Sequence, residues 1–483
     1  MPEIGPWGSG KFGGCAVSKV RGNADGVVEW SRRDPWRERM VEMVEKHFRK
    51  ACDLNDIDIH DLDDVIGDAG MVAVNCAFED CCTTVWEDGS NLCADYLKRR
   101  GWKETVINRA YIEALRDSVM TLYEVIDVRP GESFIARDLV RGGDPVRVCE
   151  RTATKTLVVW DIVATRIVTV RGVVQMTGAV LPIGRDLAED MLGLLRRTKV
   201  RASGMAAETY GAVDPAFSAQ LEAELTDDEQ LLRAGAATIT TLWLNDAIRR
   251  YLAPPPQLAN TDGEPMAFVT LHYRLAPNAT AAAIAEAVAR VPDLRADDDG
   301  AHWTWFAPAK LASKARKRQG GDDPDVGRTI HGGVALNDGK LEVRVNSEAR
   351  AARIRALLAP ALAGLVREPL IERMTVEQAM AQAQRAKEPA PRSLEGGAGA
   401  ADLRKVVHEV LDRQYRKTLN APVPMLDGKS PQQAVRSAKG RIAAANWLKV
   451  FEQNTARLPA DDPMRDYDFG WMWDKLGIAD LRS

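Results

Sequence analysis

The sequence predicts an α+β protein in which helical and strand-rich segments occupy separate stretches of the chain. Residues 35–118 carry apolar side chains at three- and four-residue steps, the spacing of amphipathic helices. After Val119 the pattern changes to short alternating segments bounded by Gly, Pro and Asp, which is typical of strands joined by turns. Three consecutive prolines, Pro254–Pro256, end a helical stretch, and a second mixed unit follows them.

The composition is that of an ordinary globular protein. The chain has 483 residues, of which 45% are hydrophobic and 28% charged, so a sizeable core can form. Its length fits two to four domains of about 100–200 residues each. The 65 basic and 69 acidic residues leave a formal net charge of -4. This balance argues against a protein built mainly to coat nucleic acid, but local basic patches remain open.

Nothing in the sequence resembles a membrane span or a secretory signal. No stretch of about 18 apolar residues is present, and the first residues lack a basic region followed by an apolar one. The seven cysteines are an odd number in a large chain, which argues against a disulfide framework. We therefore expect a cytoplasmic protein without a membrane partner.

Turn-forming residues separate the predicted strands from one another. Five short strands within residues 119–182 indicate a small barrel or a strongly curled sheet. The last two are expected to form a hairpin at Arg171-Gly172. In the second mixed unit, Asn337-Asp338-Gly339 predicts another hairpin, and Ser347 is expected to cap the helix that follows it.

These patterns divide the chain into six segments. A stretch rich in Pro, Gly and Ala precedes the last segment and is typical of a linker. The predicted organisation is a flexible lead (1–34), a helical domain (35–118), a small β-barrel-like domain with a trailing helix (119–200), a helical connector with an α/β sandwich (201–386), a linker (387–402) and a helical module (403–483).

Four cysteines, Cys76, Cys81, Cys82 and Cys93, are the candidates for metal ligands. Structural zinc sites usually present short C-x₂₋₄-C knuckles in pairs, so that four ligands converge tetrahedrally. Here one C-x₄-C is followed by a lone cysteine, and the first three cysteines lie on a predicted helix. The spacing favours small apolar residues packed in a helical core, so we expect neither a metal nor another cofactor.

A basic run is the candidate for nucleic-acid binding. It follows Trp305-Phe306, and basic side chains beside aromatic ones can hold a nucleic-acid backbone and stack bases. The strand-rich middle also carries many arginines, and small barrels commonly bind oligonucleotides. The alternative is a solvated charged loop. The residues of the run are Lys310, Lys314, Arg316, Lys317 and Arg318.

Catalytic motifs are missing from the sequence. It has no HExxH pair, no Gly-x-Ser-x-Gly elbow and no paired Cys and His of the kind that nucleophilic enzymes use. No catalytic residue can be named, and the sequence favours a protein that is not an enzyme. An enzyme with an unrecognised site stays open as an alternative.

The C-terminal segment carries the most specific pattern in the chain, residues 424–434, which read Pro-Met-Leu-Asp-Gly-Lys-Ser-Pro-Gln-Gln-Ala. Asp427-Gly428 predicts a tight turn, Ser430 a helix cap with Pro at the first helical position, and Gln433 the second half of a capping box. With the Gly440-Arg441 that follows, this segment resembles the toxin-binding domain of the MbcA/ParS/Xre antitoxin family. The resemblance implies a protein partner of the toxin-like class for residues 403–483.

The chain ends in an aromatic-rich stretch that offers a partner-binding candidate. Trp471, Met472 and Trp473 form a stripe suited to docking on a partner or on the protein's own core, and burial in its own core is the favoured alternative. The larger arrangement, with the cysteine-bearing helices and the passage around residues 137–142, looks like a family of large uncharacterised bacterial proteins. That resemblance implies no activity.

Three functions follow from these patterns. The first is a cytoplasmic protein-binding regulator related to toxin–antitoxin modules, because of the C-terminal motif. The second is a nucleic-acid-binding protein that uses the β-barrel-like middle and the Lys310–Arg318 run. The third is the enzyme with an unrecognised site.

Overall fold

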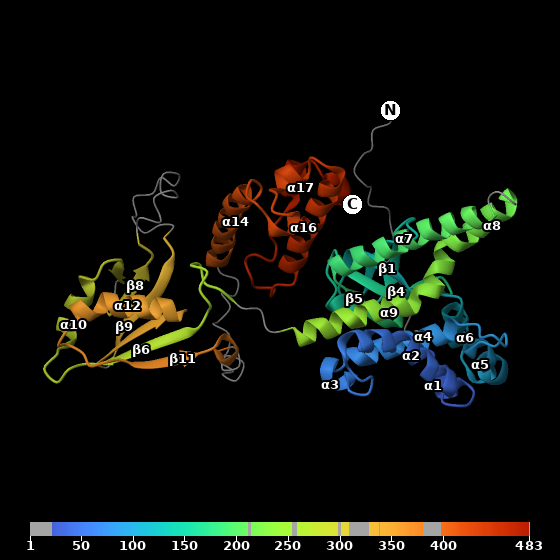
Figure 1. Ribbon diagram of the computed structural model, residues 1–483, viewed down its shortest axis with the longest axis horizontal. Coiled ribbons are helices and arrows are strands. Elements are labelled where there is room, and N and C mark those ends of the chain that lie inside the picture. The colour runs from blue at the N-terminus through green and yellow to red at the C-terminus, as the bar shows by residue number, and fades with distance from the viewer. Residues whose placement is uncertain are drawn as a thin grey trace. The chain divides into compact units, whose positions relative to one another are not determined.

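The computed structural model describes residues 22–210, 214–253, 258–297, 301–308, 328–337, 339–379 and 398–482. Contacts divide the chain into two compact units (Figure 1). Unit 1 combines residues 1–253 with residues 394–483, and unit 2 comprises residues 254–393. Both contain helices and an antiparallel sheet, so the α+β expectation is confirmed. Within the described ranges, no helix is long and apolar enough to span a bilayer.

Unit 1 begins with a group of helices. Val27 is fully buried, and the Trp30 indole donates to Asp95 at 2.9 Å, so residues 25–31 are held as a helix within the segment expected to be a flexible lead. That expectation was therefore wrong for residues 22–34, and residues 1–21 lie outside the described ranges. The helices are α1 (Asp25–Ser31), α2 (Trp36–Asn55), α3 (Leu62–Ile66), α4 (Ala69–Thr83), α5 (Leu92–Arg100), η1 (Gly101–Lys103) and α6 (Val106–Arg116).

The strand-rich middle is a five-stranded antiparallel sheet in the order β3-β2-β1-β4-β5. The predicted hairpin is confirmed, because β4 and β5 pair through Val170 and Val173, and Arg171 and Gly172 both have positive φ in the turn. The outer strands β3 and β5 approach each other but do not pair, so the sheet is curled and open rather than a barrel. The strands are β1 (Thr121–Arg129), β2 (Ser133–Asp138), β3 (Val146–Cys149), β4 (Ile162–Val170) and β5 (Val173–Ile183), with η2 (Ala153–Lys155) after β3.

Three helices follow the sheet, namely α7 (Arg185–Tyr210), α8 (Pro215–Thr226) and α9 (Asp228–Leu252). Helix α7 begins two residues after β5 ends. Helix α9 packs against α2 and α4 (Figure 1). Its Leu244 and Ile248 are fully buried in the same core as strands β4 and β5. The helical stretch expected to connect to the second mixed unit therefore belongs to the core of unit 1.

Unit 2 contains a six-stranded antiparallel sheet in the order β11-β6-β10-β9-β8-β7, and α10 and α12 pack against it. The hairpin predicted at residues 337–339 is present, since Asn337 of β9 pairs with Lys340 of β10, and Ser347 caps α12 by accepting from the Arg350 N–H at 3.0 Å. The elements are β6 (Phe268–Arg274), α10 (Ala281–Ala289), β7 (Leu294–Ala296), β8 (His302–Phe306), β9 (Ile330–Asn337), β10 (Lys340–Val345), α12 (Glu348–Ala361) and β11 (Leu370–Met374).

The C-terminal module is a small helical bundle with its own apolar core. Its motif folds as the sequence predicts. Asp427 and Gly428 turn with positive φ, and the Ser430 hydroxyl and the Gln433 side chain form a reciprocal capping box. The elements are α14 (Ala398–Thr418), η3 (Pro424–Leu426), α15 (Pro431–Ala434), α16 (Ala438–Ala456), α17 (Gly470–Leu476) and η4 (Ala479–Leu481), and α14 starts inside the predicted linker.

Candidate ligand-binding site beside the C-terminal module

The four candidate metal ligands are buried thiols. Cys76, Cys81 and Cys82 lie on α4 and Cys93 on α5, each with 0% exposure, and all four are free. Burial raises the pKa of Cys81 to about 12, and it also raises the pKa of Cys76 and the pKa of Cys82 well above their ordinary value, so these thiols stay neutral. No group of three or more metal-ligating side chains occurs in the described part of the chain.

The two patches considered for nucleic acid have different outcomes. The run formed by Lys310, Lys314, Arg316, Lys317 and Arg318 lies outside the described residues. In the strand-rich middle, Arg141 contacts Asp138 at 2.7 Å, and Arg166, which is 1% exposed, contacts Asp80 at 3.2 Å. Arg166 is therefore part of the interior and contributes nothing to a basic surface.

The aromatic stripe near the C-terminus packs inside the module. Met472 and Trp473 are 0% and 1% exposed, and Trp471 is partly buried with its indole N–H donating to Tyr467 Oη at 2.9 Å. Burial in the protein's own core was the favoured alternative for these three residues. Trp473 also contacts Trp160 of the sheet region, at 6.5 Å between ring centroids, so it lies where the module meets the rest of unit 1.

A buried carboxylate on β1 lies at the centre of the contact between the C-terminal module and the sheet. Glu124 is 3% exposed and accepts from Lys449 Nζ of α16 at 3.0 and 3.1 Å and from Arg185 Nη1 at 3.0 Å. Arg137 Nη2 lies 3.3 Å from the same carboxylate. Burial lowers the pKa of Lys449, and the carboxylate of Glu124 opposes this change. One carboxylate thus faces three cationic side chains.

Trp160 is the second anchor of α16. Its φ of 74° is in the left-handed region, which costs a non-glycine residue about 1–3 kcal/mol and persists only where surrounding contacts hold it. Those contacts are present: the Trp160 carbonyl accepts from Arg185 Nη2 at 2.8 Å, its indole N–H donates to Glu452 at 2.6 Å, and Lys449 Nζ lies 4.4 Å from its ring centroid. The ring is thereby fixed between the sheet and the module.

Asp161 extends the polar contact to the end of α16. It accepts from Gln453 and from Arg457 Nη2, while its other oxygen accepts from the backbone N–H of Val158 at 2.9 Å. Lys449, Gln453 and Arg457 are spaced by four residues, so one face of α16 makes the whole contact. The module is consequently held on the sheet by ion pairs and hydrogen bonds around two tryptophan rings.

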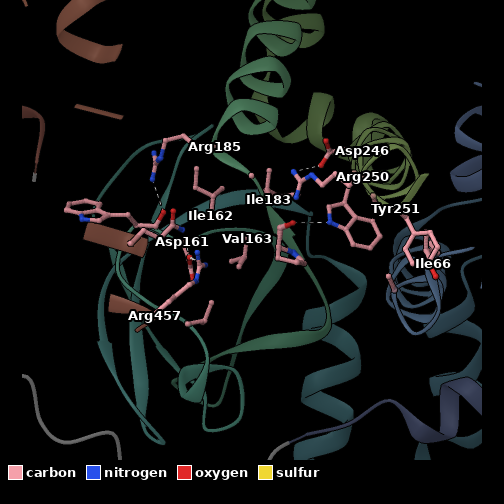
Figure 2. A pocket seen from close by; sticks show the side chains of 18 residues that line it. Ile66, Asp161, Ile162, Val163, Ile183, Arg185, Asp246, Arg250, Tyr251 and Arg457 are labelled. Atoms are coloured by element: carbon pink, nitrogen blue, oxygen red, sulfur yellow. Dashed lines mark hydrogen bonds and ion pairs between the residues drawn. The ribbon is translucent and has the colours of Figure 1, made fainter. Parts of the chain in front are cut away.

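A cavity of about 600 Å³ opens beside this contact (Figure 2). Its walls come from the start of β4, the end of β5, the start of α7, the C-terminal half of α9 and the end of α16. Charged and aromatic side chains line it around an apolar floor that includes Ile162 and Ile183. The charged and aromatic lining residues are Trp160, Asp161, Arg185, Trp243, Asp246, Arg250, Tyr251 and Arg457.

The cavity has more cationic than anionic side chains. Arg185, Arg250 and Arg457 face two carboxylates, Asp161 and Asp246. Arg250 pairs with Asp246 four residues earlier on α9, and 65% of its side chain is exposed, so this pair is a weak one. The arrangement provides guanidinium groups, an adjacent helix start and flat aromatic surfaces, which can bind a ligand; it brings together no acid–base pair that suggests a reaction.

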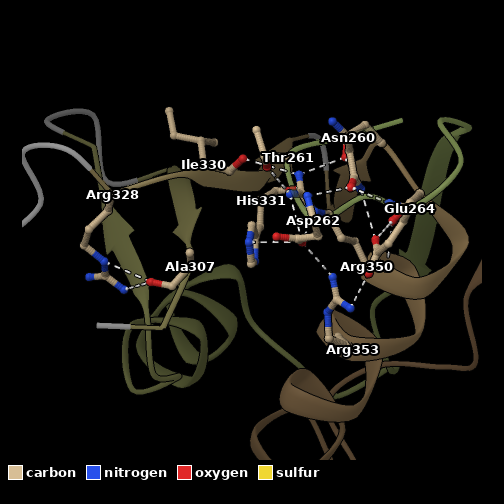
Figure 3. Close-up of polar contacts among 12 residues, drawn as sticks. Asn260, Thr261, Asp262, Glu264, Ala307, Arg328, Ile330, His331, Arg350 and Arg353 are labelled. Atoms are coloured by element: carbon tan, nitrogen blue, oxygen red, sulfur yellow. Dashed lines mark hydrogen bonds and ion pairs between the residues drawn. The ribbon is translucent and has the colours of Figure 1, made fainter. Parts of the chain in front are cut away.

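Unit 2 has a polar cluster of its own, around Arg350 (Figure 3). The Arg350 side chain is 1% exposed and donates to Asp262 at 2.9 and 3.0 Å and to Thr261 at 2.7 Å. His331 Nε2 lies 3.4 Å from the same Asp262 carboxylate, and burial lowers the pKa of His331. These contacts fasten the segment before β6 to α12 and β9, which explains the cluster as structural.

The fold and the site together define an α+β protein whose central curled sheet carries a helical module on one side and a polar cavity beside it. Residues 84–209 match a family of unknown function, DUF7986. The match contains the five-stranded sheet and α7 except for its last residue, with Glu124, Trp160 and Arg185, whereas α9 and the C-terminal module lie outside it. No curated protein and no solved structure matches the chain.

Proposed function

We propose that this protein is a cytoplasmic protein-binding regulator whose C-terminal module recognises a protein partner. The observation that carries the proposal is a pair of exposed apolar side chains on α14: Val406 is 56% exposed and Val410, one turn later, is 48% exposed. On the other side of the helix, Leu411 and Tyr415 pack into the core of the module. Helix α14 therefore has an apolar stripe on both sides, and the described part of the chain leaves the stripe of Val406 and Val410 exposed.

The two faces of the module support a division of roles. Helix α16 uses its polar face to bind the sheet through Lys449 and Arg457. Helix α14 has no such use for Val406 and Val410, and an apolar i, i+4 pair on a helix is a usual element of helix recognition by protein partners. The resemblance of residues 403–441 to an antitoxin domain supports a partner of the toxin-like class.

The test compares matched variants of the full chain. Val406→Asp/Val410→Asp places two charges in the exposed stripe, and Val41→Asp/Leu54→Asp places two charges on α2, where both side chains are also exposed, at 58% and 59%. Each tagged protein is used for affinity capture from the native host with and without nuclease. A protein recovered by the wild type is then purified and its Kd is measured.

We expect a partner that is captured by the wild type and the α2 variant but not by the α14 variant, with at least a tenfold weaker Kd for the latter and no effect of nuclease. Equal binding by all three proteins would show that the α14 stripe is not the contact. Recovery of species that disappear on nuclease treatment would instead support the nucleic-acid-binding alternative.

A further inference from the structure

We propose that the cavity beside α16 binds a small ligand that combines a phosphate group with an aromatic or apolar body. This site is independent of the partner surface on α14, so each proposal stands or fails by itself. The charges of the cavity, the helix that begins at its wall and its apolar surfaces favour such a ligand.

Two of the guanidinium groups that line the cavity can exchange a carboxylate for another anion. The lining contains three arginines and two carboxylates, and the third arginine, Arg185, is paired with Glu124, which lies outside the lining. Arg457 already binds Asp161, but its side chain is 50% exposed, and among the described residues the ion pair of Arg250 is with its helical neighbour Asp246. A phosphate oxygen can replace a carboxylate oxygen at either arginine, because guanidinium binds both groups with the same two-pronged geometry.

The position of α7 adds to this preference. The helix is 26 residues long and begins at Arg185, and Gly184 and Arg185 both line the cavity. The first N–H groups of a helix have no partner within the helix and create a partial positive charge that favours phosphate. The Arg185 side chain is only 10% exposed and is held by Glu124 at 3.0 Å and by the Trp160 carbonyl at 2.8 Å, so the start of the helix is fixed at the cavity wall.

The remaining surfaces suit a flat or apolar body. Trp243 is 7% exposed and its indole N–H donates to the Pro182 carbonyl at 2.9 Å, so the orientation of the ring is fixed. Ile66 and Ile162 contribute apolar surface to the same cavity, and Tyr251 stands at its rim with 65% exposure (Figure 2). The volume of about 600 Å³ is in the range of small-molecule sites.

The experiment uses phenyl phosphate as the probe, with inorganic phosphate and benzyl alcohol as its two halves, and measures binding to the full chain by calorimetry. Arg250→Gln removes one guanidinium that has no structural role beyond its exposed pair. Arg49→Gln is the control, since Arg49 forms the same type of i, i+4 pair with Glu45 and is similarly exposed, at 64%. Equal thermal unfolding of the two variants and the wild type checks their folding.

We expect saturable binding of phenyl phosphate, weaker binding of inorganic phosphate, and no binding of benzyl alcohol. Arg250→Gln should weaken phenyl phosphate binding about tenfold, as the loss of one charge-assisted hydrogen bond implies, while Arg49→Gln should leave it unchanged. No saturable binding of either phosphate, or equal binding by the Arg250→Gln protein, would overturn the site. Equal affinity for phenyl phosphate and inorganic phosphate would refute the proposal that the ligand has an aromatic or apolar body.

Discussion

Replacing Glu124 by Gln is the sharpest test of how the module is attached. The substitution keeps the shape of the side chain and removes its charge, so Lys449, Arg185 and Arg137 face each other without a counter-charge. Breaking a buried ion pair by removing one partner costs about 3–5 kcal/mol. We expect the lower end, about 3 kcal/mol, because Arg137 is 26% exposed and because the lowered pKa of Lys449 makes it easier for this side chain to lose its proton.

A change of this size is measurable by native-state hydrogen exchange. If the module detaches by local opening, about 3 kcal/mol corresponds to exchange roughly a hundred times faster for the α16 amides near Lys449. Glu45→Gln is the control, because Glu45 forms an exposed pair whose loss costs less than about 0.5 kcal/mol. Unchanged exchange of α16 in the Glu124→Gln protein would refute the central role assigned to this carboxylate.

A double-mutant cycle separates this ion pair from general effects on folding. Lys449→Met keeps most of the length of the side chain and removes its charge. If Glu124 and Lys449 interact as the 3.0 and 3.1 Å contacts indicate, the double variant should be destabilised less than the sum of the single variants, by more than about 0.5 kcal/mol. Additive effects would mean that the two charges are not energetically coupled.

Three further predictions concern single positions. Gly440→Ala should destabilise the module by about 1–3 kcal/mol in urea unfolding, because the new Cβ would lie 1.9 Å from a backbone oxygen of the preceding helix. Gly235→Ala is the control: its new Cβ would have no atom within 4 Å, so this variant should be neutral or stabilising. Arg350→Ala should lower the stability of unit 2 by about 3 kcal/mol, because it leaves a buried hydrogen-bond network open, while Arg355→Ala, in an exposed pair, should change it by less than about 0.5 kcal/mol. Hydrogen bonds from an arginine and a serine lower the pKa of Glu264 to about 2, so its contribution to stability is complete above pH 4.5 and lost as the pH falls toward 2; Glu264→Gln should remove this part of the acid titration.

Local chemistry explains which parts of the fold the sequence predicts. The hairpin at Arg171-Gly172 and the capping box of Ser430 and Gln433 depend on residues within a few positions of one another, and both are present. Barrel closure depends instead on whether β3 pairs with β5, and no short-range pattern determines that pairing. The core that α9 joins is also determined by distant residues, since an apolar stripe on a helix does not show which part of the protein packs against it.

The candidate site was missed for the same reason. Glu124 stands within Thr121-Leu122-Tyr123-Glu124-Val125, where every position is buried, and a charge in an apolar strand was the one signal available. Its partner Lys449 is 325 residues away in the sequence, and Arg185 is 61 residues away. The sequence alone gives no means of joining these three residues, and the resemblance of the C-terminal segment concerns its turn and caps rather than the polar face of α16.

The polar character of this contact bears on how a partner-binding module would work. A module joined to the sheet by a continuous apolar surface would be a permanent part of the core. The contact observed here is dominated by Glu124, Asp161 and the cationic groups of α16, and ion pairs of this kind give orientation and specificity more than net affinity. The module can therefore be held in one orientation at small net cost while Val406 and Val410 stay uncovered on α14. On this reasoning, Glu124→Gln should loosen the module without reducing the intrinsic affinity of α14 for a partner. Val406→Asp/Val410→Asp should reduce that affinity and leave the module attached to the sheet.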